Sequence, residues 1–63
     1  MSIALVNDWT LLALKCSELD QFLQDAETVE QHESDDDLVL LQAQLDAMRV
    51  LLFIYEIRVN KMQ

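Results

Sequence analysis

A chain of 63 residues forms at most one small domain, and an apolar core alone rarely stabilises a domain of this size. Its single cysteine, Cys16, excludes an internal disulfide and leaves no set of soft ligands for structural zinc. The hydrophobic content of 52% excludes intrinsic disorder despite a net charge of −8, so we expect self-association or a protein partner to supply the missing stability.

The first predicted element is a helix over residues 7–30, which Asn7 or Asp8 can cap. Apolar residues recur along it at alternating steps of four and three, the repeat of a helix that packs lengthwise against another. This apolar row consists of Leu5, Trp9, Leu12, Cys16, Leu19, Leu23 and Ala26. Glycine and proline are both absent from the chain, which favours long helices over sheets with tight turns.

A turn is predicted at residues 31–34 and a second helix at residues 35–62. Ser34 followed three residues later by Asp37 resembles a capping box. Three aspartates at 35–37 favourably oppose the positive end of the helix dipole, and Arg58 and Lys61 lie near the opposite end. The same four-three repeat continues through this helix at Leu38, Leu41, Leu45, Met48, Leu52, Tyr55, Val59 and Met62.

The two rows predict an all-α fold, an antiparallel two-helix hairpin of coiled-coil type formed by residues 1–63 as one unit. The side chains expected to form the seam between its helices are Leu12, Leu19, Leu23, Leu41, Leu45, Met48, Leu52 and Tyr55. A single continuous helix is the main alternative, because nothing in the turn forbids helical conformation.

The second helix is more apolar than a hairpin requires. Beyond its row it has Val50, Leu51, Phe53, Ile54 and Ile57, so residues 50–59 are apolar nearly all round. A helix that is hydrophobic on every side is usually a buried helix, and one partner helix cannot cover it. We therefore expect these residues to bind a different protein, to join copies of the chain into a helical bundle, or to do both.

Charge and residue types exclude several functions. Nine acidic residues and no basic one occur from Glu18 to Asp37, so nucleic acid is not an expected ligand, because phosphate binding needs clustered lysine and arginine. Cys16 falls in the apolar row and His32 in or beside the turn, too far apart for a nucleophile and its base. We therefore expect no enzyme activity, no cofactor and no metal site.

The apolar run from Val50 to Tyr55 is much shorter than the ~20 residues that span a bilayer, and the first residues lack the basic region of a secretory signal. The sequence thus predicts a cytoplasmic protein without membrane insertion. Three functions remain open: a module that binds a partner through its apolar helix, an acidic antitoxin or DNA mimic that inhibits a basic protein, and a simple coiled-coil oligomerisation module.

Residues 38–57, LVLLQAQLDAMRVLLFIYEI, resemble the second helix of the small co-chaperones of bacterial type III secretion needle subunits, the YscE/PscE type. The positions that match are Leu41, Gln42, Gln44, Ala47, Met48, Leu52 and Ile54. The tip of the predicted hairpin, where the two helices meet the turn, is more acidic here than in that family, and the turn lacks glycine. The resemblance implies a virulence-associated bacterial protein that pairs with a helical-repeat chaperone and, through it, keeps a needle subunit soluble before export.

Overall fold

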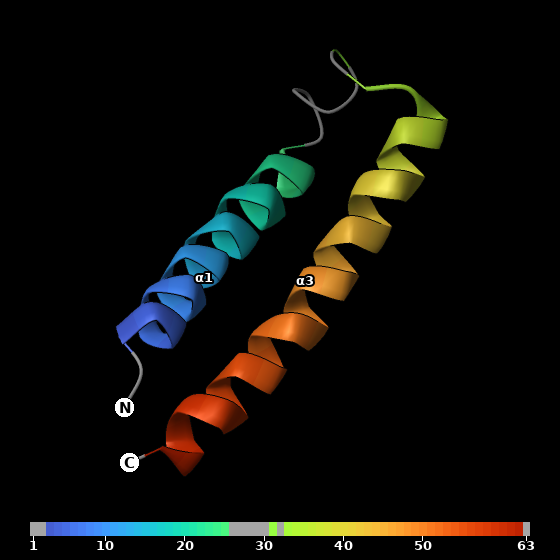
Figure 1. The fold of residues 1–63 in the computed structure, drawn as a ribbon. Helices are drawn as coiled ribbons and strands as arrows, with labels where there is room; N and C mark the ends of the chain where they lie inside the picture. Colours follow the sequence, from blue (N-terminus) through green and yellow to red (C-terminus); the bar gives the residue numbers. More distant parts are fainter. Residues whose placement is uncertain (1–2, 26–30, 32, 63) are drawn as a thin grey trace.

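The computed structural model describes residues 3–25, 31 and 33–62, and within these ranges it contains two long helices. Helix α1 comprises Ile3–Gln24 and helix α3 comprises Asp35–Lys61. They lie side by side and run in opposite directions, so that the start of α1 and the end of α3 are at the same end of the hairpin (Figure 1). The molecule measures 44 × 15 × 14 Å. The predicted two-helix hairpin is confirmed, and the alternative of one continuous helix is wrong.

Helix α1 begins four residues before the predicted start at residue 7. The reason is packing, since Leu5 is only 8% exposed and its burial stabilises an additional turn of helix. Asn7 and Asp8 consequently lie within the helix, exposed to solvent, and cap nothing.

Helix α1 ends at Gln24, short of the predicted end at residue 30. The Asp25 N–H donates to the carbonyl oxygens of both Gln21 and Phe22, at 3.2 Å each, the shared bond that is common at helix ends. The rest of the predicted first helix, 26–30 with Ala26, lies outside the described residues.

Helix α3 begins at the predicted residue, and Ser34 caps it. Ser34 has an extended backbone (φ −75°, ψ 164°), and its Oγ accepts a hydrogen bond from the Asp37 N–H at 3.3 Å. The second half of the expected capping box differs: the Asp37 carboxylate accepts from the Ser34 hydroxyl at 2.9 Å, because aspartate is one methylene shorter than the usual glutamate. The helix ends at Lys61, one residue before the predicted end.

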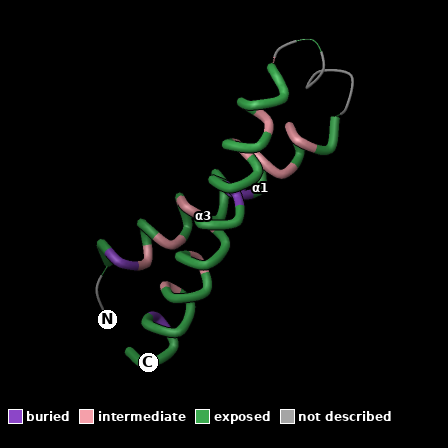
Figure 2. The backbone as a smooth tube through the Cα atoms, turned by 90° about the vertical axis from the view of Figure 1, so that its right-hand side faces the viewer, coloured by how far each residue is buried: buried purple, intermediate pink, exposed green. Residues whose placement is uncertain are grey.

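The interior is a single thin layer of side chains between the helices. Leu5, Cys16, Leu45 and Val59 are buried, and Leu45 is the most enclosed at 2% exposed. The remaining described members of the two apolar rows are half-buried, except Met62, which is exposed beyond the end of α3. Figure 2 shows buried positions as short segments in a largely exposed tube. Two helices can cover only one face of each other, so every other face meets solvent.

Candidate docking surface

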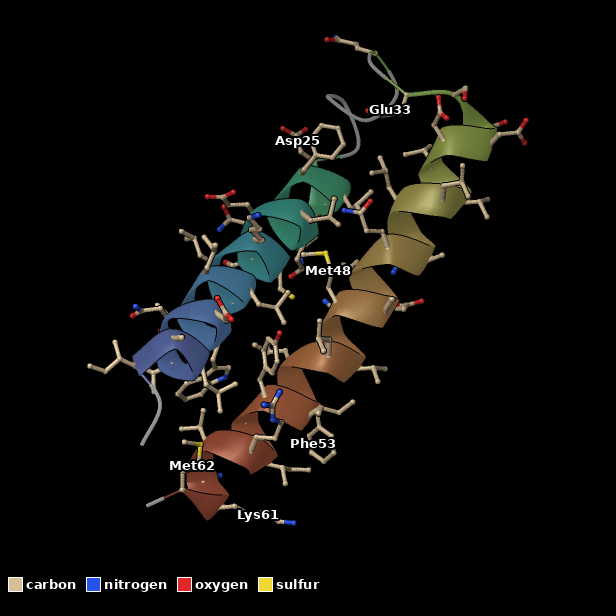
Figure 3. The ribbon with its side chains drawn as sticks, in the orientation of Figure 1. Asp25, Glu33, Met48, Phe53, Lys61 and Met62 are labelled. Carbon is tan, nitrogen blue, oxygen red and sulfur yellow. The ribbon has the colours of Figure 1, made fainter. Side chains whose placement is uncertain are left out.

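The apolar residues predicted to bind a partner all lie on the exposed part of α3. Phe53 is 62% exposed, and it lies on the side of α3 away from α1 (Figure 3). Met48, a member of the seam, points instead toward α1. The exposed apolar group comprises Val50, Leu51, Phe53, Ile54 and Ile57. No other part of the chain that the structure describes covers this group.

The exposed apolar surface also extends beyond these residues, toward the tip of the hairpin. Val39 and Leu40 are 69% and 66% exposed, and sequence reasoning did not include them. Leu40 begins a second row with alternating steps of three and four, on the face of α3 opposite the seam. We name this row the outer stripe; it consists of Leu40, Ala43, Ala47, Val50, Ile54 and Ile57, all exposed. The repeat was visible in the sequence and could have revealed it.

A hollow of about 200 Å³ lies between the helices along one flank of the hairpin. Leu51 and Tyr55 line it from α3, and Leu11 lines it from α1. The remaining lining residues are Leu12, Asp8 and Lys15. The lining is therefore mostly apolar, with one negative and one positive side chain. The hollow is open to solvent and offers a place for one apolar side chain of a bound protein. Sequence analysis missed it, because it depends on how the two helices are rotated against each other.

The opposite flank is polar. An Arg49 Nη2 on α3 lies 3.0 Å from Asp20 Oδ1 on α1, forming a salt bridge between the helices. Gln24 Nε2 donates to the other Asp20 oxygen at 3.1 Å. Asp20 is one of the nine acidic residues counted between Glu18 and Asp37, and its charge is paired with that of Arg49. The hairpin therefore has a hollow with apolar lining on one flank and a polar contact between the helices on the other.

The chemically reactive residue types do not form a site among the described residues. Cys16 is 7% exposed and lies in the seam, and His32 lies outside the described residues. Across 3–25, 31 and 33–62, no three His, Cys, Asp or Glu side chains are grouped so as to hold a metal ion. Asp35, Asp36 and Asp37 are exposed in the first turn of α3, where they oppose the helix dipole.

Helix α3 is long enough and apolar enough to cross a membrane, judged by length and composition alone. The prediction from the sequence considered only the short run from Val50 to Tyr55 and so underestimated the length of the apolar segment. Between Leu38 and Tyr55 the only charged residues are Asp46 and Arg49. Core helices of soluble proteins meet the same criterion, so the finding is weak evidence for a membrane location.

These features define a class of protein: a small helical hairpin with one helix whose apolar outer face is not covered by any other described residue. The chain belongs to the Sequestin family, whose model matches residues 4–61 and so includes both helices. No curated protein and no solved structure matches the chain.

Proposed function

We propose that this protein binds and sequesters a helical segment of another protein on the exposed apolar surface of α3. The observation that supports the proposal is the exposure of Val50, Phe53 and Ile57 on a helix that the hairpin covers on one face only. Burying one such side chain is worth about 1.5–3 kcal/mol, so each of them that a partner covers favours the complex. The family name Sequestin agrees with a sequestering role.

A protein partner explains α3 better than a lipid bilayer does. Asp46 and Arg49 lie near the middle of the helix, where each charge costs about 2.5–3.5 kcal/mol in a membrane-spanning segment. Arg49 also forms the salt bridge that joins α3 to α1, and this bridge is exposed to water. A bound protein can leave the Asp20–Arg49 bridge in solvent and cover only the exposed apolar side chains of α3.

The more specific proposal is a co-chaperone of type III secretion in the bacterial cytoplasm. In this role the outer surface of α3 docks on a helical-repeat chaperone, and the pair holds the needle subunit soluble before export. The resemblance of residues 38–57 to the YscE/PscE type supports it, as does the combination of small size, acidic charge and an uncovered helix. The protein acts by binding alone and needs no cofactor.

Two variants of the full chain test this proposal. Phe53→Glu with Ile57→Glu places two charges on the docking surface, whereas Asp35, Asp36 and Asp37 changed to Asn removes charge at the tip. Each tagged variant is incubated with lysate of the source bacterium, and bound proteins are identified by mass spectrometry. We expect the wild type and the tip variant to recover a helical-repeat chaperone, and the Phe53/Ile57 variant to lose it while remaining helical by circular dichroism.

The salt dependence of binding distinguishes this proposal from the alternative that the protein is an acidic mimic. Docking through apolar side chains changes little between low and high ionic strength, whereas binding through exposed carboxylates weakens steeply. If the tip variant loses its partner while the Phe53/Ile57 variant keeps it, and the wild-type complex dissociates in salt, the proposal is wrong and the protein is an inhibitor of a basic protein.

A further inference from the structure

The outer stripe has a pattern that matches itself when reversed. Its members are placed symmetrically about the point between Met48 and Arg49. If a second copy of α3 lies antiparallel against the first about this point, Leu40 faces Ile57 of the second copy. Ala43 then faces Ile54, and Ala47 faces Val50. Each pair beyond the first sets a small side chain against a β-branched one, which is how the faces of two helices interlock closely.

The charges at the two ends of α3 match in the same register. Asp36 precedes the stripe and Lys61 follows it, and these two residues are placed symmetrically about the same point. Both are exposed. In the antiparallel arrangement Asp36 of each copy faces Lys61 of the other, and the acidic first turn lies near Arg58. A parallel arrangement would instead set three aspartates against the same three and alanine against alanine.

We propose that a second copy of this chain occupies the outer stripe, with its α3 antiparallel in this register, giving a two-fold symmetric dimer whose four helices lie in one row. From Leu40 to Ile57 the contact spans about 26 Å of helix. The two copies of α3 form the centre, and each α1 lies outside. The dimer is a property of the isolated chain and does not depend on the sequestering role. A protein helix that binds the same face would displace the second copy.

Sedimentation equilibrium of the full chain tests the dimer. Val50 lies close to the symmetry axis, so Val50→Glu brings two buried carboxylates near each other, and we expect dimerisation at least about 100-fold weaker. Leu14→Glu is the matched control, because Leu14 is 55% exposed, similar to Val50 at 61%, but lies on α1. This control should dimerise like the wild type. Circular dichroism checks that both variants remain helical.

Cysteine cross-linking tests the orientation. In a Cys16→Ala background, one chain has Leu40→Cys and another has Ile57→Cys. We expect a disulfide between the two chains when they are mixed and oxidised, and none within samples of either chain alone, since like positions are then about 26 Å apart. A parallel dimer would give the reverse result.

Three outcomes would overturn the proposal: a wild-type chain that stays monomeric at high micromolar concentration, equal weakening by Val50→Glu and Leu14→Glu, or cross-links between like positions. A monomeric wild type would mean that the outer stripe binds a different protein and not a second copy. The partner-binding test above is independent, since a chain that captures a chaperone can do so as a monomer.

Discussion

At the scale of single residues, stability is concentrated at a few positions of the seam. Leu45 is 2% exposed, near the centre of α3, whereas Leu52 one heptad later is only half-buried. The seam is therefore enclosed unevenly along its length, and its buried positions include Leu5 and Val59 at the open end of the hairpin. No polar or charged residue is buried among the described residues. The stabilisation at the buried positions is therefore almost purely apolar.

Leu45→Ala should lower the free energy of unfolding by about 2–5 kcal/mol, because it removes a fully enclosed side chain and leaves a cavity. Leu52→Ala should cost less, since part of that side chain already meets water. Leu14→Ala, at an exposed position outside the seam, should change the free energy by no more than about 0.5 kcal/mol. Urea denaturation followed by circular dichroism measures all three. Equal losses for Leu45 and Leu14 would show that the helices are packed differently.

The polar contact between the helices should contribute little. Arg49 and Asp20 are 52% and 37% exposed in their side chains, so water screens their attraction. A double-mutant cycle with Asp20→Asn and Arg49→Gln should give a coupling free energy of about 0.2–1 kcal/mol. A coupling of several kcal/mol would mean that another molecule covers this flank and excludes water from it.

At the scale of elements, the two helices illustrate different sources of helix boundaries. The start of α3 was predictable because Ser34 and Asp37 form their capping contacts locally. The start of α1 was not, because Leu5 is buried by α3 and this packing outweighs the capping preference of Asn7 and Asp8. The Asp20–Arg49 bridge and the hollow were equally hidden, since both depend on the relative rotation and shift of the helices. The exposed outer residues were predictable from the repeat alone, because the face of a helix opposite the seam of a hairpin is uncovered.

Ser34→Ala should destabilise the protein by about 0.5–2 kcal/mol, because the Asp37 N–H loses its acceptor at the start of α3. Ser17→Ala is the matched control: Ser17 is exposed within α1, where alanine is the better helix former, so the change should be neutral or slightly stabilising. Thermal melts of both variants, compared with the wild type, measure the difference. If both changes are neutral, the cap contributes nothing measurable to the fold.

At the scale of the whole molecule, an isolated hairpin exposes more apolar surface than a small soluble domain usually tolerates. The four-three repeat specified which faces of the two helices meet, and the resulting antiparallel pair is the fold observed. The same repeat on the opposite face of α3 is exposed and has no complement among residues 3–25, 31 and 33–62. Folding and association should therefore be linked, with the dimer more stable than the monomer it contains.

Linkage makes the melting temperature depend on concentration. If unfolding of the wild type separates a dimer into two chains, a tenfold rise in concentration adds about 0.7 kcal/mol per chain, half of the RT ln 10 gained per dimer. For a domain near this size, 1 kcal/mol corresponds to about 4–8 °C, so the melting temperature should rise by about 3–5 °C per tenfold. Val50→Glu should abolish the dependence and leave a lower, constant value, whereas Leu14→Glu should retain it. Melts followed by circular dichroism from about 5 to 500 μM cover two such steps, and a wild-type melting temperature that stays constant over this range would contradict the linkage.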